Sequence, residues 1–410
     1  MFILHLKTIT SEYSAVDCFY KFFPKPIFVA CETNSYASQF CTESKMEELS
    51  PRSGYKQWNE CTAEDITAIT AIEIDMAYYF SKTSWLNSTP KFSNTMSRDK
   101  YQLLSSFLHF ADSSKQHPKS DPQYDPLLKI RPVIDIVKDI YLDEFEPGCN
   151  LSADETMLRF KGRLWFKQYI PSKPSTKWGV KLCSLCNSKM EFILRFDAYV
   201  RKDKTNVGND LDTGLGERVI RKLLQGFEYS QHIIYCDNFF TSPSLFQYLR
   251  DIDIGAYGTV RPNRCGMPAD GFRNAKKPKM VFEYNENMNG VDRFDQLLSS
   301  YCFYHKNRKW YHVLWHFLVE AAIVNGKIAY TMSHHTKLSA IQYRNRVIEG
   351  LLEEYAQPPP KKKGSSCSNV FPLARLSKSH FIGIQSDKNH KLNCVVCSIM
   401  PYQCKLKGKV

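Results

Sequence analysis

Four aspartates stand where carboxylates could hold divalent cations. Asp154 lies in a strand-like run, and Asp237 directly follows the short apolar strand 233–236. Asp292 and Asp295 begin a helix and share one of its faces. Mg²⁺ prefers oxygen ligands, and two such ions ~4 Å apart can hold the attacking and leaving oxygens of a phosphoryl transfer. The pattern predicts a catalytic site for two Mg²⁺ or Mn²⁺ ions, held by Asp154, Asp237 and Asp292. Each aspartate alone is equally compatible with a helix cap or a turn.

Positive charge and aromatic rings are concentrated directly after Asp154. Residues 156–190 contain eight Lys or Arg, no Asp or Glu, and five aromatic residues. Cations neutralise phosphates, and exposed rings stack on unpaired bases, so we expect contact with DNA. Two further basic groups follow, near residues 261–279 and 305–310. The expected DNA-binding residues are Arg159, Lys161, Arg163, Lys167, Lys173, Lys177, Arg261, Arg264, Lys306, Arg308, Lys309 and Trp310. For any one of them, a solvated charge or a core ring is the alternative.

The cysteines indicate the compartment and one further metal site. Fourteen cysteines without secretory features are typical of reduced thiols inside the cell. Cys394 and Cys397 have the spacing of a zinc knuckle, with Cys404 nearby. The alternatives are a single Zn²⁺ site and a tail without metal.

Composition narrows the class of protein. The chain has 410 residues, 43% of them hydrophobic, and a formal net charge of +13, which favours a folded protein with a polyanionic partner. The longest apolar stretch, 313–324, is interrupted by charge and too short to span a bilayer, so we expect no membrane segment. We find no glycine-rich phosphate loop and no nucleophile elbow, which disfavours ATPase and hydrolase functions.

The periodicity of apolar residues predicts the elements that position these groups. Helices are expected before residue 149, including one capped by Ser97 and one over 130–145. Strands follow at 182–186, 192–196, 233–236 and 255–260, and helices at 217–227, 245–249, 289–298 and 311–332. A Pro/Lys/Ser-rich linker covers 358–366. Alternating strands and helices in the middle predict an α/β core inserted in a mostly helical framework.

Several short segments, taken in order, resemble the piggyBac family of transposases and their host-derived relatives. They are Met96–Tyr101 with Phe107–Phe110, Ser152–Glu155 with Phe160–Arg163, Tyr169–Pro174 with Lys177–Gly179, Asp237–Ser242, Gly258–Arg261, and Tyr284–Asn285 with Gly290–Asp292 and Asp295–Gln296. One such segment would be weak, but six in the right order are specific.

The resemblance implies an RNase H-like core, a mixed sheet flanked by helices, with Asp154, Asp237, Asp292 and Asp295 as its acids. It also implies cut-and-paste transposition at TTAA sites on double-stranded DNA, a homodimer on DNA, a nuclear location and a C-terminal zinc-binding cysteine-rich domain, of which this chain has only a short cysteine-containing tail. The expected regions are a weakly ordered 1–60, a helical dimerisation and DNA-binding domain 61–148, core parts 149–265 and 289–356, an insertion remnant 266–288, a linker 357–379 and a truncated tail 380–410.

The interval between the second and third acids departs from the family. Asp292 follows Asp237 by only 55 positions, where relatives carry a long insertion with a tryptophan-bearing strand. The shortening looks like a deletion that would displace the helix of Asp292. The alternative function is therefore a catalytically impaired, host-derived DNA-binding protein that descends from a transposase. A product that does not fold stably is the third alternative.

Overall fold

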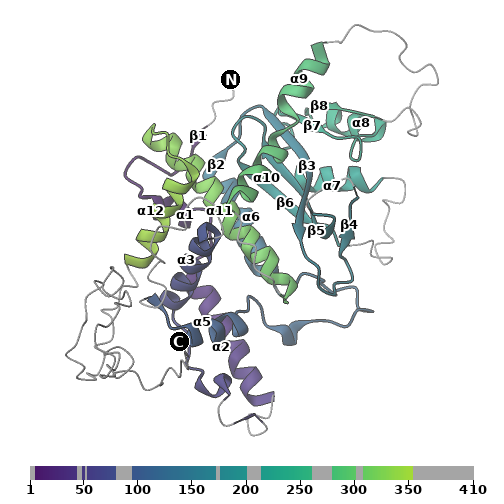
Figure 1. Ribbon diagram of the computed structural model, residues 1–410. Helices are drawn as coiled ribbons and strands as arrows, with labels where there is room; N and C mark the ends of the chain where they lie inside the picture. Colours follow the sequence, from purple (N-terminus) through teal and green to yellow (C-terminus); the bar gives the residue numbers. More distant parts are fainter. Residues whose placement is uncertain are drawn as a thin grey trace, which may run out of the picture. The chain divides into compact units, whose positions relative to one another are not determined.

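The computed structural model describes residues 5–43, 49–50, 53–79, 95–171, 176–200, 214–260, 279–301 and 308–353 (Figure 1). They belong to one unit, Met1–Gln357. The expected linker 357–379, the tail 380–410 and most of the insertion remnant 266–288 lie outside the described residues.

A six-stranded mixed sheet forms the centre of this unit. The strands follow the order β4-β5-β3-β7-β8. Strand β6 also pairs with β5, further along the edge that β4 occupies. Strands β3, β5 and β6 are antiparallel neighbours, whereas β3, β7 and β8 run parallel. The bounds are β3 Asn150–Arg159, β4 Gln168–Tyr169, β5 Trp178–Asn187, β6 Ile193–Ala198, β7 Ile233–Cys236 and β8 Gly255–Gly258.

Parallel strands need crossover connections, and two helices supply them. Helix α7, Leu215–Leu223, lies in the connection from β6 to β7, and helix α8, Pro243–Asp251, lies between β7 and β8. The side chain of Ser242 accepts a hydrogen bond from the Leu245 N–H and caps α8, with Pro243 in its first turn. Figure 1 shows α8 beside the β7–β8 edge.

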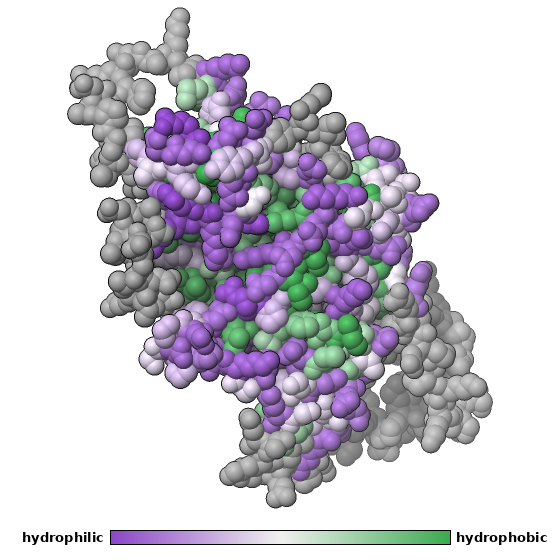
Figure 2. Space-filling view, turned by 180° about the vertical axis from the view of Figure 1, so that it is seen from behind, coloured by the Kyte–Doolittle hydropathy of each residue, from purple (hydrophilic) through white to green (hydrophobic). Residues whose placement is uncertain are grey.

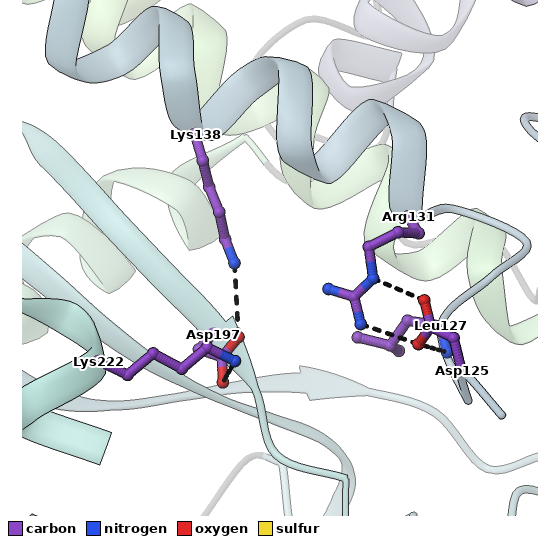
Figure 3. A network of polar contacts seen from close by, with 6 residues as sticks. All are labelled: Asp125, Leu127, Arg131, Lys138, Asp197 and Lys222. Atoms are coloured by element: carbon purple, nitrogen blue, oxygen red, sulfur yellow. Dashed lines mark hydrogen bonds and ion pairs between the residues drawn. The ribbon is translucent and has the colours of Figure 1, made fainter. Parts of the chain in front are cut away.

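The two faces of the sheet carry different helices. Asp197 on β6 is the register partner of Cys183 on β5. Its carboxylate forms ion pairs with Lys138 of α6 (Arg131–Glu144) and with Lys222 of α7. Figure 3 shows this network together with the Arg131–Asp125 pair at the start of α6. Phe196, the next residue along β6, points to the opposite face and contacts Phe317. Helices α6 and α7 therefore cover one face, and α10 and α11 cover the other.

The remaining helices pack around α11, Trp310–His334. Seventeen of its residues are buried, and its Trp315 stacks on Phe110, 4.6 Å between ring centroids. The Glu320 carboxylate of α11 forms a buried ion pair with Arg344 of α12. The other elements are β1 His5–Leu6, α1 Ala15–Tyr20, α2 Pro26–Glu43, η2 Gly54–Gln57, α3 Ala63–Tyr79, α5 Arg98–Phe107, η3 Ser113–Lys115, β2 Phe145–Glu146, α9 Lys279–Asn287, α10 Gly290–Ser300 and α12 Ala340–Glu353.

Every strand predicted in the core is confirmed, and so are the helices at 130–145, 217–227, 245–249, 289–298 and 311–332, within a few residues. Ser97 caps α5 as expected, because its hydroxyl accepts the Lys100 N–H. Helices α9 and α12 were not predicted. No helix in the described part of the chain is long and apolar enough to cross a membrane. Seen from behind, patches of apolar residues show between rows of hydrophilic ones (Figure 2).

Candidate active site and nucleic-acid interface

Asp154 and Asp237 are neighbours at the point where the pairing of β3 with β7 ends. Strands β3 and β7 are parallel, and their last paired residues are Ala153 and Cys236. The next residue on each strand is the aspartate, so the two backbones lie one strand spacing apart, ~5 Å. The sequence predicts Asp154 within a strand and Asp237 directly after one, and the structure places both residues so. In the structure Asp154 also accepts the Glu155 N–H, and Asp237 accepts the Thr259 hydroxyl.

Helix α10 brings the second pair of acids to this strand. Val291, Phe294 and Leu298 bury one side of the helix. Asp295, next to that side, accepts a 2.9 Å hydrogen bond from the Thr156 hydroxyl on β3. The approach is close, because a Cβ at Gly290 would lie 2.2 Å from Ser152 Oγ and 3.1 Å from Ser188 Cα. The fit of α10 on β3 therefore requires glycine at this position.

Asp292 lies one helical turn before Asp295 and is exposed. The four acids thus come from the middle of β3, the position directly after β7, and α10, which packs on β3. All are oxygen donors of the type that Mg²⁺ and Mn²⁺ accept. Within the described ranges, however, no group of three His, Cys, Asp or Glu side chains is arranged to hold a metal ion. The four carboxylates thus have the right chemistry for such an ion, but in this structure they do not point to one common metal position.

Two hydroxyl groups near the acids were missed by sequence reasoning. The Tyr284 hydroxyl of α9 donates to the Cys236 carbonyl. Burial raises the pKa of Tyr284, and the negative charges of Asp237 and Asp154 raise it further. Thr156 also contacts Ser184, with 3.2 Å between the hydroxyl oxygens. Tyr284 stands in one of the family-like segments, whereas no sequence signal marks Thr156.

Lys181 connects the residues that follow each of the two neighbouring acids. Its ammonium pairs with Glu155, which follows Asp154. The same ammonium lies 3.9 Å from the ring centroid of Phe239, two residues after Asp237. Lys181 is 8% exposed, so this cation serves the interior of the fold.

The basic stretch after Asp154 divides into exposed and buried side chains. Of the expected DNA-binding residues, Arg159, Lys161, Arg163 and Lys177 are exposed and Lys167 is half-buried. Phe160 and Phe166 belong to the core, whereas Trp165, Tyr169 and Trp178 are exposed. The alternative interpretation, an aromatic ring buried in the core, therefore holds for two of the five aromatic residues.

Only residues 308–310 of the third basic group are described, and among them Arg308 is exposed. The Lys309 ammonium donates to the Ser106 carbonyl, and burial lowers the pKa of Lys309 to about 8. Trp310 packs edge-on against Phe166. Lys309 and Trp310 thus make structural contacts, and their role in DNA binding stays a prediction.

Several predicted residues lie outside the described ranges: Lys173, Arg261, Arg264, Lys306, Cys394, Cys397 and Cys404. The proposed zinc site of the tail therefore stays a prediction.

Comparison with known proteins gives a consistent result. The sequence model of the Transposase IS4 family matches residues 14–276 and 269–327. The two matches overlap at residues 269–276, where the sequence indicates a shortened insertion. Two Homo sapiens proteins are similar: PiggyBac transposable element-derived protein 3, 24% identical over 333 residues (66% of this chain, 55% of that protein), and PiggyBac transposable element-derived protein 2, 25% identical over 399 residues (78% and 62%). The chain thus spans less than two thirds of either protein's length.

The fold has a solved counterpart. The cryo-EM structure of a piggyBac transposase synaptic complex with hairpin DNA matches with a TM-score of 0.72, at 22% identity, over 91% of each chain. This likeness confirms the predicted fold class, an RNase H-like core in a largely helical framework.

Proposed function

The chain belongs to the Transposase IS4 family, in its piggyBac branch, and on that premise we propose that it cuts DNA and joins the freed strand ends to a target. The observation that carries the proposal is the register of β3 and β7, which makes Asp154 and Asp237 neighbours where β7 ends. Helix α10, held to β3 through Asp295 and Thr156, brings the remaining acids to the same strand.

The proposed reaction is an in-line substitution at phosphorus. A water oxygen attacks the phosphodiester and frees a 3′-hydroxyl, which then attacks a second phosphodiester. Asp154, Asp237 and Asp292, with Asp295, would hold Mg²⁺ or Mn²⁺, and such ions supply charge stabilisation for the attacking and leaving oxygens. Thr156 and Thr259 orient the Asp295 and Asp237 carboxylates, and Lys181 fixes the residues that follow Asp154 and Asp237.

The partner that we propose is double-stranded DNA with piggyBac-type terminal repeats and TTAA target sites. Arg159, Lys161, Arg163 and Lys177 offer exposed cations for its phosphates. A homodimer on DNA and a nuclear location complete the proposal.

A cleavage assay tests the proposal. We expect the purified chain to cut labelled DNA with piggyBac-type ends and TTAA flanks in Mg²⁺ or Mn²⁺. Asp154→Asn and Asp237→Asn should each reduce cutting by about 100-fold or more, the scale for losing a group that stabilises transition-state charge. Binding of the same DNA should persist in both variants.

Asp251→Asn is the matched control, because Asp251 is exposed on α8 and outside the site. Cutting that survives Asp154→Asn would refute catalysis at these acids. A cooperative melting transition of each protein excludes misfolding as the cause of lost activity.

A second candidate, a DNA-binding protein without cutting activity, is favoured by one specific observation. The described residues contain no group of three ligands that converges on a metal position. The 55-position interval between Asp237 and Asp292 agrees with it. Wild-type protein that binds terminal-repeat DNA and leaves it uncut in both metals would support this candidate over the first.

A further inference from the structure

The exposed rings of Tyr169 and Trp178 form a pair at one edge of the sheet. They stand directly opposite each other in the β4–β5 pairing, with ring centroids 4.6 Å apart. Tyr169 is 49% exposed and Trp178 is 47% exposed. Phe160 and Phe166, from the same stretch, are 3% and 1% exposed, so the fold buries two rings here and leaves this pair at the surface.

The surroundings of the pair are fixed and positively charged. The Lys167 ammonium lies 5.1 Å from the Trp178 ring centroid and donates to the Gly162 carbonyl. Lys161, Arg163 and Lys177 are exposed on neighbouring segments. Because residues 156–190 contain no acid, nothing in this stretch offsets the positive charge.

The pair lies on the same face of the sheet as the proposed acids. Ser184 on β5 is the register partner of Asp154, and Trp178 lies six positions away along β5. Side chains alternate along a strand, so even-numbered separations share a face, and six positions span ~20 Å. Figure 1 shows β4 at the opposite end of the sheet from α9. The rings and Asp154 are therefore ~20 Å apart on one face, a distance that a single bound DNA molecule spans.

Charge and ring chemistry together identify the class of ligand. The cations favour a nucleic acid over an apolar protein surface, since charged residues are depleted at the centre of protein interfaces. Bases of an intact duplex are stacked on each other and offer no free ring face, whereas unpaired bases stack on aromatic side chains. We propose that Tyr169 and Trp178 form a stacking site for unpaired bases of single-stranded DNA.

The inference deepens the proposed function, because the bound strand would be a part of the same DNA. Its test compares two labelled DNAs of one sequence, a blunt duplex and the same duplex with an unpaired tail of about ten nucleotides. Fluorescence anisotropy measures the affinity of the full chain for each. Wild-type protein should prefer the tailed DNA.

Trp178→Ala should weaken binding of the tailed DNA by roughly 10-fold, the effect of losing one stacked base, and leave blunt-duplex binding unchanged. Trp178→Phe should retain most of the preference because it keeps a ring. Two controls should leave the preference unchanged. Lys161→Ala should weaken both DNAs alike, and Trp165→Ala removes an exposed ring that is outside the pair.

Equal effects of Trp178→Ala on both DNAs, or no effect on either, would overturn the stacking site. The proposed function would still stand if the protein binds the blunt duplex. A change of oligomeric state in Trp178→Ala, measured by sedimentation, would assign the pair to a protein interface instead. Wild-type protein that binds neither DNA would overturn both proposals. The melting temperature of Trp178→Phe should equal that of wild type. A change in its DNA binding would then reflect the binding site and not a folding defect.

Discussion

At the scale of single residues, Thr156 is the contact between the strand of Asp154 and the helix of Asp295. Its hydroxyl donates to the Asp295 carboxylate at 2.9 Å and lies 3.2 Å from the Ser184 hydroxyl. A β-branched residue also suits the middle of a strand. The position therefore serves the sheet through its shape and the acids through its oxygen.

Thr156→Val keeps the shape and removes the oxygen. We expect the free energy of unfolding to fall by about 1 to 2 kcal/mol, the loss for a hydrogen bond to a charged group that is only half-buried. Urea denaturation measures the change. Thr156→Ser retains the hydroxyl and should stay closer to wild type; equal losses in the two variants would mean that packing, and not the hydrogen bond, is responsible.

The sequence predicted that Asp154 and Asp237 belong to one site, but it gave no prediction for Thr156. Asp237 directly follows an apolar strand, which is visible as a local pattern, and α/β sheets usually place their chemistry at such strand ends. The partner of Thr156 lies 139 positions away, and it is determined by how α10 packs on β3. Such a contact has no local signature.

At the scale of elements, the contact of α10 with β3 depends on Gly290. A methyl group there would lie against Ser152 Oγ and the Ser188 backbone, and the backbone cannot move aside easily. We expect Gly290→Ala to lower the free energy of unfolding by about 1 to 3 kcal/mol, as overpacking does. DNA cutting should fall further than in a surface variant, because the helix carries Asp292 and Asp295.

Thermal melting and the cleavage assay measure the two effects. Gly214→Ala is the control, because nothing lies within 4 Å of a Cβ at that position and its φ is −61°. If Gly290→Ala matched Gly214→Ala in both measurements, the close approach of α10 would not matter for either property.

Three helices meet at His109, which is 1% exposed. His109 follows the end of α5 by two residues. Its ring stacks on Tyr36 of α2, with 3.3 Å between the ring centroids, and contacts the Tyr311 hydroxyl of α11. Burial lowers the pKa of His109 from 6.5 to about 3, and the positive charge of Lys309 adds to the effect. The neutral ring is therefore part of the packing between these helices.

The lowered pKa makes stability depend on acid in a defined window. Between pH 6.5 and 3 the unfolded chain binds a proton at His109 that the folded chain excludes, so this contribution to stability is lost as pH falls. From pH 6.5 to 4.5, wild-type protein should lose about 2 kcal/mol more than His109→Gln in urea denaturation. Parallel losses in the two proteins would place the acid sensitivity elsewhere.

The elements differ in how well their sequences reveal them. Strand β7 is a short apolar run with a sharp end, and α10 begins at Asn289–Gly290, so both were predicted. Helix α9 follows residues 261–278 and buries only Asn287 outright, so its weak apolar pattern gave no prediction. Its position comes from tertiary contacts, including the Tyr284 hydroxyl bond and the Tyr257–Glu283 bond.

At the scale of the whole molecule, the fold class could be predicted because the alternation of strands and helices is long and regular. The pairing of β4 and β6 along the same edge of β5 could not be predicted, since composition does not show which strand lies next to β5. The same limit applies to the acids. Sequence places Asp154 within a strand, Asp237 after a strand and the other two acids on a helix, whereas the directions of their side chains depend on packing and on bound ions.

The earliest and latest helices described here are packed together. The Tyr343 hydroxyl of α12 donates to the Ala15 carbonyl of α1, and a Cβ at Gly326 of α11 would lie 3.1 Å from the Cys18 carbonyl oxygen. During synthesis, α1 leaves the ribosome more than 300 residues before these partners exist, a wait of roughly half a minute at ordinary translation rates. Throughout that time Phe19 and Cys18 lack the cover that α11 and α12 give them in the folded protein, so apolar surface stays exposed on the nascent chain.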